Sequence, residues 1–153
     1  MPFRENWVIT MLMKIFFLTH VVSTITMTGI IWFIQLVHYP LLKLVGKNEF
    51  ASYEISHTKR ITCTVAPLMF VELFTGLCFL WKRPTAVTLE EAWIGAGLLG
   101  VIWLSTIFLQ VPQHHVLARH FDAGAHEKLV NTNWVRVLAW SLRTWLVFHM
   151  LLK

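Results

Sequence analysis

Four long apolar runs constrain the fold of this 153-residue chain more than any other feature. They cover roughly residues 14–37, 61–81, 92–111 and 134–152. A helix needs about 20 apolar residues to cross roughly 30 Å of hydrocarbon, and only helices satisfy their backbone hydrogen bonds within one such segment. The composition agrees, because 56% of the residues are hydrophobic and only 14% are charged. We therefore predict an all-α integral membrane protein, a four-helix bundle that forms a single domain over residues 1–153.

The limits of the runs indicate how the helices begin. The first run is too long for the apolar core of a cleaved signal peptide, and no small-residue cleavage site follows it, so we expect it to stay as a helix. Thr88, with Glu90 and Glu91 after it, is a typical cap for the start of the third helix. Between the first two runs, Phe50 and Tyr53 are spaced among polar residues, which predicts an interfacial helix or loop there.

The same features limit the expected partners. The formal net charge of +5 comes without a basic cluster interleaved with aromatic residues, so we expect no nucleic-acid binding. We expect membrane lipids and a lipophilic small molecule as partners, in a bacterial inner membrane. Gly95, Gly97 and Gly100 in the third run would allow close helix contact, within the bundle or between the copies of a homo-oligomer.

Histidines are concentrated at one end of the predicted bundle. With four crossings, the linkers over residues 39–60 and 112–133 share one side of the membrane. The histidines on this side or at its boundary are His38, His57, His114, His115, His120 and His126. We expect His120 and His126 to be solvated loop residues, and only one of the adjacent His114 and His115 can face inward.

Three of these histidines suggest a metal site. His38, His57 and His114 lie at similar depth at the ends of three predicted helices. Glu54 precedes His57 at the i, i+3 spacing by which di-iron bundle helices aim a carboxylate and an imidazole at one ion. These four side chains are candidate ligands of iron or copper. The alternative is that Glu54 and His57 are surface residues of an interfacial helix.

Two charged residues fall within the apolar runs themselves. Glu72 and Arg143 each lie about nine residues from the same end of the second and fourth runs. Ionisable groups at this depth usually face the bundle interior and pair with one another. We predict a Glu72–Arg143 ion pair at the bilayer centre. It would handle protons or ligand charge as a catalytic pair, or it would only fix the register of the helices.

Arg136, Trp140 and Arg143 share one face of the fourth run, at steps of four and three residues. A guanidinium next to an indole can clamp an anion or stack on a planar ring, so Arg136 and Trp140 are candidates for cofactor binding. The alternative for Arg136 is that its side chain extends to the lipid headgroups.

Two stretches resemble known families. Within Thr19–Leu80, His20 is followed by "GIIWF", "VHYP", "HTKRI" and "APLMFVELFTGL", and this order resembles the bacterial membrane protoporphyrinogen oxidase family. The resemblance implies a small helical membrane protein with haem b, in which His20 is the candidate haem ligand and Lys59 or Arg60 contacts a propionate or the substrate. The stretch "NTNWVRVLAWSLR", with its Asn-x-x-Arg spacing, is similar to the last helix of the anthrone-oxygenase-like membrane proteins.

Together these features predict a membrane-embedded, oxidoreductase-like protein that acts on a lipophilic or aromatic small molecule with haem b or a non-haem metal. The candidate residues are His38, Glu54, His57 and His114 for a metal, His20, Arg60, Arg136 and Trp140 for cofactor binding, and Glu72 and Arg143 for catalysis. The alternative is a non-enzymatic membrane subunit for transport, metal handling or complex assembly, whose histidines are structural or respond to pH.

Overall fold

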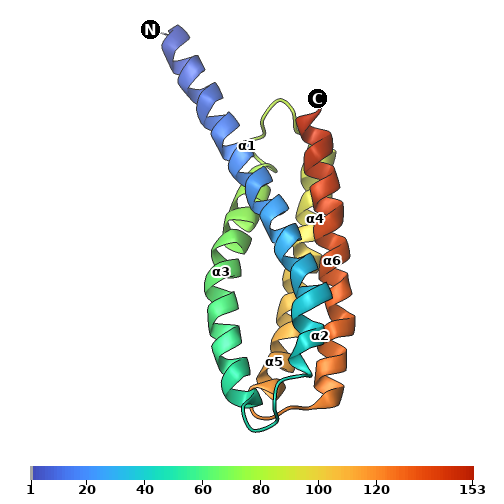
Figure 1. Ribbon diagram of the computed structural model, residues 1–153. Helices are drawn as coiled ribbons and strands as arrows, with labels where there is room; N and C mark the ends of the chain where they lie inside the picture. Colours follow the sequence, from blue (N-terminus) through green and yellow to red (C-terminus); the bar gives the residue numbers. More distant parts are fainter. Residues whose placement is uncertain (1) are drawn as a thin grey trace.

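The computed structural model describes the backbone of residues 2–153 and the side chains of residues 7–153, and all regular structure in this part of the chain is helical. The four long helices are α1 (Pro2–Phe33), α3 (Phe50–Cys78), α4 (Leu89–Ser105) and α6 (Ala123–Leu151). Figure 1 shows them side by side, with both ends of the chain at one end of the bundle and the first part of α1 extending beyond it. The predicted all-α four-helix bundle is confirmed.

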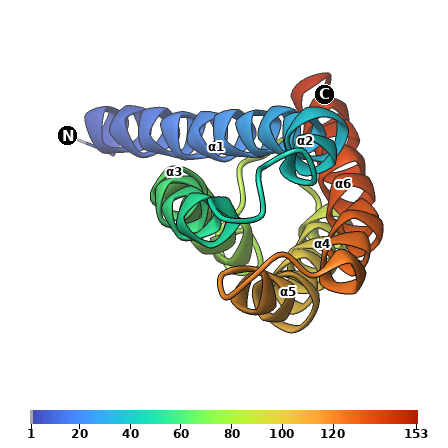
Figure 2. The same ribbon diagram turned by 60° about the horizontal axis from the view of Figure 1, so that its bottom comes forward.

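Helices that follow one another in the chain also lie next to one another in space. α1 packs on α3, α3 on α4, and α4 on α6, and α6 returns to α1. The view along the bundle in Figure 2 shows this ring, with α3 diagonally across from α6. An up-and-down arrangement of this kind places residues of all four helices around one shared interior.

Two π-helical turns follow α1 and α4, toward the end of the bundle opposite to the chain termini. The first, Ile34–His38, joins α1 to the short α2 (Tyr39–Leu42), and the second, Thr106–Gln110, joins α4 to α5 (Val111–Leu117). Each π turn ends two residues before a proline, Pro40 or Pro112, which lacks the N–H that an α-helix would use. The wider turn allows the helix to continue past the proline, and turns of this kind are frequent at functional sites.

The helices are longer than the apolar runs that predicted them. α1 and α2 together reach Leu42, α4 and α5 together reach Leu117, and α6 begins at Ala123. Of the predicted interfacial helix or loop, the structure has the loop, residues 43–49, because α3 already begins at Phe50. Phe50 is fully buried and packs edge-on against Phe121, which explains why the polar stretch from this residue onward continues the bundle helix.

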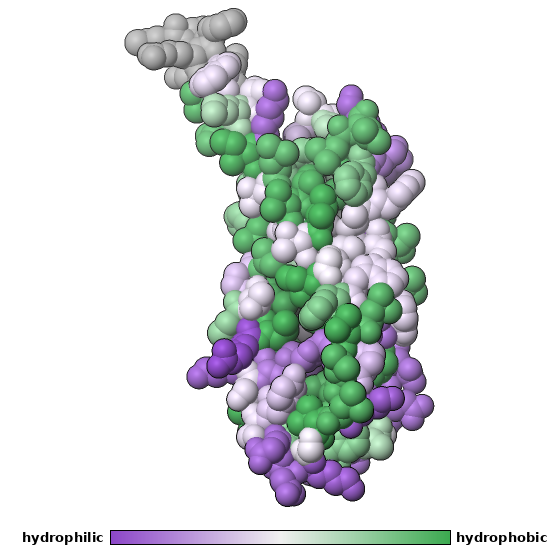
Figure 3. Space-filling model, in the orientation of Figure 1, coloured by the Kyte–Doolittle hydropathy of each residue, from purple (hydrophilic) through white to green (hydrophobic). Residues whose placement is uncertain are grey.

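Three helical stretches are long and apolar enough to cross a membrane: Trp7–Leu42, Phe50–Cys78 and Leu89–Leu117. α6 falls short of that apolarity within the described residues, because it carries Arg136 and Arg143. In Figure 3 apolar residues cover much of the middle of the visible face, and hydrophilic residues gather at its lower end. The three helices indicate an integral membrane protein.

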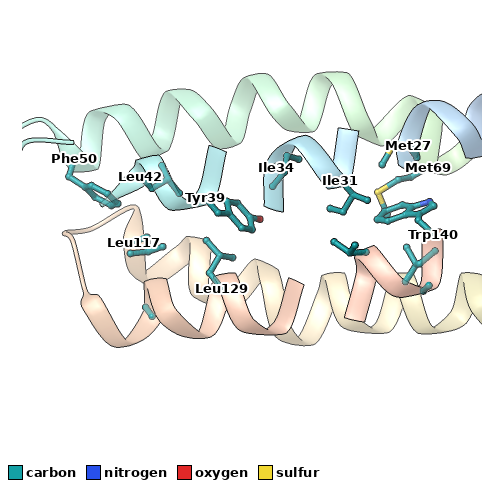
Figure 4. Close-up of a cluster of buried hydrophobic side chains, with 14 residues drawn as sticks. Met27, Ile31, Ile34, Tyr39, Leu42, Phe50, Met69, Leu117, Leu129 and Trp140 are labelled. Atoms are coloured by element: carbon teal, nitrogen blue, oxygen red, sulfur yellow. The ribbon is translucent and has the colours of Figure 1, made fainter. Parts of the chain in front are cut away.

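Two clusters of buried apolar side chains fill the bundle. One, near the chain termini, includes Phe17, Phe79 and Leu146. The larger one extends from Trp140 to the opposite end of the bundle, where Phe50 lies. Figure 4 shows this larger cluster, with the Tyr39 hydroxyl directed into the space between the helices. Two polar sites lie within this apolar interior.

Candidate functional site

The first polar site is an ion pair in the middle of the bundle. Arg143 Nε lies 3.1 Å from Glu72 Oε1, and both side chains are buried. Glu72 Oε1 also accepts a hydrogen bond of 2.7 Å from Thr24, and Oε2 accepts one of 2.8 Å from the indole of Trp140. The predicted Glu72–Arg143 pair is confirmed, and both carboxylate oxygens have partners within the protein.

The remaining nitrogens of Arg143 are also engaged. Nη1 donates to the Gly95 carbonyl at 2.6 Å, and Nη2 lies 3.3 Å from His20 Nε2. One guanidinium therefore connects α1, α3, α4 and α6. The adjacent cavity measures only about 10 Å³, the space of a single water molecule. This geometry favours the alternative in which the pair fixes helix register.

His20 belongs to the same network. Because Arg143 can only donate, His20 Nε2 must accept, and Nδ1 then donates to Thr75 Oγ1 at 2.7 Å. A Cβ added at Gly76 would lie 3.3 Å from the His20 ring and 2.7 Å from Leu99. A haem ligand needs a free ring nitrogen and room for a porphyrin, so these residues do not fit a haem at His20. Arg60, the predicted propionate contact, lies exposed on α3.

The second polar site borders a much larger cavity than the first. A cavity of about 290 Å³ lies between α1, α3, α5 and α6, toward the end of the bundle opposite to the chain termini. Much of its wall is apolar and includes Met27, Ile31 and Met69. Its polar wall consists of Tyr39, His57, Thr58, Thr62, Thr106, Gln110, His114, His115 and Arg136. A largely apolar pocket with a few polar groups is the usual form of a small-molecule site.

A chain of hydrogen bonds runs away from this cavity. The Tyr39 hydroxyl lies 3.2 Å from His114 Nε2, and His114 Nδ1 lies 2.5 Å from Glu54 Oε1. Glu54 is fully buried on α3. A carboxylate accepts the Nδ1 proton and thereby leaves Nε2 as an acceptor for the tyrosine hydroxyl. Both Tyr39 and His114 line the cavity, and the Tyr39 hydroxyl is the end of this chain, so a proton can pass between a molecule in the cavity and the chain through Tyr39.

Arg136 is the cation of the same cavity wall. Its side chain is only 6% exposed, so it does not extend to lipid headgroups. Its guanidinium lies 5.2 Å above the Trp140 ring, and Nη1 makes a long contact of 3.4 Å to Asn133 Oδ1. No ion pair of the described side chains includes it, and its Nε has no hydrogen-bond partner. The guanidinium also interacts with the Tyr39 hydroxyl, so its described partners are neutral groups and no anion balances its charge.

The predicted metal ligands meet at this site, but not as a metal centre. The rings of His38 and His57 are stacked with centroids 4.1 Å apart, and His57 and His114 are 6.0 Å apart. The nitrogen lone pairs of an imidazole lie in the plane of the ring, so those of two stacked rings do not converge on one ion. Both nitrogens of His114 already have protein partners. Among residues 7–153 no three His, Cys, Asp or Glu side chains are arranged to hold a metal ion. In this arrangement the described side chains therefore form no ligand set for iron or copper, although His38 Nε2 and Glu54 Oε2 are buried without a partner.

Two residues at the site were not expected from the sequence. The sequence pattern assigns no role to Tyr39, which follows His38 directly, whereas in the structure its side chain is buried in the bundle just after the π turn. The interpretation of His126 as a solvated residue is wrong, because its Nε2 lies 2.8 Å from the Tyr39 carbonyl. The tyrosine of "VHYP", between a histidine and a proline, was the available signal.

Comparison with known proteins gives no match to a family model, to a curated protein or to a solved structure. The site is therefore interpreted from its own geometry.

Proposed function

We propose that this protein binds a lipophilic or aromatic acid inside a bacterial inner membrane and exchanges a proton with it through Tyr39. The observation that carries the proposal is that a buried, incompletely paired cation, Arg136, lines the same apolar cavity as Tyr39 and His114, whose hydrogen-bonded chain continues to the buried Glu54.

The charge of Arg136 determines the class of ligand. Transfer of a guanidinium from water into an apolar interior is costly unless an anion pairs with it. The oxygen of a carboxylate, phenolate or enolate would supply that anion, and the guanidinium of Arg136, which lines the cavity, would donate to it. The apolar wall around Met27 and Met69 suits the hydrocarbon body of the same molecule.

The hydrogen-bonded chain supplies the proton transfer. The bound acid gives its proton to the Tyr39 oxygen while the Tyr39 proton moves to His114 Nε2. The resulting imidazolium is paired with Glu54, and the ligand anion is paired with Arg136. One proton moves in each of the two steps, and no group in the cavity changes its oxidation state.

The predicted oxidoreductase role would build on this ionisation. The anion of a phenol or enol gives up electrons more readily than the neutral form, so ionisation prepares such a substrate for oxidation. Oxidation would also require a two-electron acceptor such as a quinone or dioxygen as second substrate. Both family resemblances in the sequence support redox chemistry on a lipophilic or aromatic molecule.

The lipophilic phenol 1-hydroxypyrene tests the proposal, because its ionised form has a distinct absorption spectrum. We expect the purified wild-type protein in detergent to bind this probe and to raise its ionised fraction above that in protein-free micelles. Tyr39→Phe should still bind the probe and should leave it un-ionised. Tyr53→Phe, a change of the more exposed tyrosine on α3, is the matched control. Absence of binding, or ionisation that persists in Tyr39→Phe, would contradict the proposal.

A further inference from the structure

A groove on the outer surface of the bundle leads toward the cavity. It lies between α1 and α3, has a volume of about 380 Å³, and is lined by Gly29, Ile30, Phe33, Ile34, His38, His57, Ile61 and Thr64. Ile34, His57 and Ile61 line both the groove and the internal cavity. These three side chains therefore separate the groove on the outside from the cavity on the inside.

The lining of the groove is mostly apolar. It lies within two stretches that are long and apolar enough to cross a membrane, Trp7–Leu42 and Phe50–Cys78. Phe33 at its rim is 59% exposed. The only ionisable side chains that line it are the stacked His38 and His57, at the end where groove and cavity meet. A hydrocarbon chain or ring could occupy this surface without exposing charge to the membrane interior.

Gly29 keeps the groove open. A Cβ added at this position would meet no atom within 4 Å, so the space beside it is unfilled. Thr28, its neighbour, holds α1 to α6 through its hydroxyl, which lies 2.7 Å from Thr144 Oγ1 and 3.1 Å from the Trp140 carbonyl. The helix is thus anchored on its inner face, while its outer face at Gly29 has no side chain.

We propose that the groove between α1 and α3 is a lateral portal through which a lipophilic ligand passes from the bilayer to the internal cavity. Its occupant is the hydrocarbon part of that ligand, which slides past Gly29 and reaches the cavity beside His57. This inference rests on the proposed function for the identity of the ligand, but not for the existence of the passage.

The test uses the 153-residue protein in lipid nanodiscs and three substitutions. Gly29→Phe fills the groove. Gly97→Phe is the matched control, because Gly97 is also exposed on a membrane-crossing helix and a Cβ there also meets open space. Thr62→Phe tests a passage on the other side of α3, since Thr62 is exposed and lines the cavity but not the groove.

The first measurement is the association rate of pyrenebutyrate, followed by energy transfer from the protein tryptophans. We expect Gly29→Phe to lower this rate about tenfold and to leave the equilibrium affinity within about threefold, because a blocked passage slows release as well. Gly97→Phe should match the wild type. An unchanged rate in Gly29→Phe, or a rate lowered only by Thr62→Phe, would overturn the portal.

The second measurement does not depend on the proposed ligand. A phosphatidylcholine with a photoreactive diazirine on one acyl chain is placed in the nanodisc, and labelled residues are mapped by mass spectrometry. We expect labelling of Met69, which is 5% exposed and lines the cavity, and we expect Gly29→Phe to abolish it. If pyrenebutyrate fails to bind, the proposed function fails, and this labelling alone decides on the portal. Absence of label at Met69 would then overturn the portal.

Discussion

His114 Nδ1 lies 2.5 Å from Glu54 Oε1, although 60 residues separate the two in the chain. This contact joins α5 to α3 at the edge of the cavity and directs the other ring nitrogen, Nε2, toward the Tyr39 hydroxyl. The position of Glu54 thus determines what His114 can do. A histidine without that carboxylate would be a weaker proton acceptor and would be free to change its tautomer.

Replacing Glu54 with Gln should separate proton transfer from anion binding. The variant lacks the negative charge that stabilises a His114 imidazolium, so bound 1-hydroxypyrene should be ionised less than in the wild type. Pyrenebutyrate, which is already an anion, should bind at least as tightly, because the negative charge behind His114 has been removed. Absorption spectra of the first probe and fluorescence titration with the second give the two results.

Glu49→Gln is the control for this experiment, because Glu49 is exposed just before α3 and should affect neither probe. Equal ionisation of 1-hydroxypyrene in the Glu54→Gln variant and the wild type would show that the Glu54–His114 contact does not serve proton transfer.

Replacing Glu72 with Gln should destabilise the bundle without changing the cavity. The substitution leaves Arg143 as a buried cation without its partner, and breaking a buried ion pair costs about 3 kcal/mol or more. The Glu90→Gln change, at an exposed position of the α4 first turn, should leave the free energy of unfolding nearly unchanged. Denaturant unfolding in detergent provides the measurement. A Glu72→Gln protein of wild-type stability that fails to ionise 1-hydroxypyrene would instead support a catalytic role.

Gly76 and Gly97 should respond in opposite ways to replacement with Ala. At Gly76 the new methyl group would lie 2.7 Å from Leu99 and would push against the His20 ring, so we expect a loss of about 1–3 kcal/mol of unfolding free energy. At Gly97 the methyl group meets open space, so the better helix propensity of Ala should stabilise the protein by up to about 1 kcal/mol. Equal thermal unfolding of the two variants would contradict the close packing described around His20.

The fold and the central ion pair could be predicted from the sequence because each depends on a strong rule. Apolar length dictated the helices, and the cost of isolated charges in a membrane dictated that Glu72 and Arg143 should meet. The helix ends could not be predicted in this way. An apolar run ends where polar residues such as Glu54 appear, but the helix continues through them. They are buried by residues that are distant in the chain, which the run itself does not reveal.

The second polar site was predicted by location but not by chemistry. Depth along the helices correctly brought His38, His57 and His114 to one end of the bundle. Depth carries no information on where the ring nitrogens point. In the structure His38 stacks on His57 and His114 contacts Glu54, so the three rings are not arranged around one point where a metal ion could lie. Tyr39 depends on a π turn, whose extra residue per turn is not visible in the periodicity of the sequence.

The measurement that most directly tests the central claim, that Arg136 holds an anion in the cavity, compares two ligands in two proteins. Pyrenebutyrate and pyrenebutanol have the same hydrocarbon body, and they differ in the charge of the end group. Loss of a buried charge partner costs about 2 kcal/mol or more, so Arg136→Gln should bind pyrenebutyrate roughly 30-fold more weakly than the wild type. Pyrenebutanol should bind both proteins equally, and Arg119→Gln, at an exposed site, should bind both ligands as the wild type does. Equal loss of both ligands in Arg136→Gln, or no loss of pyrenebutyrate, would contradict the account.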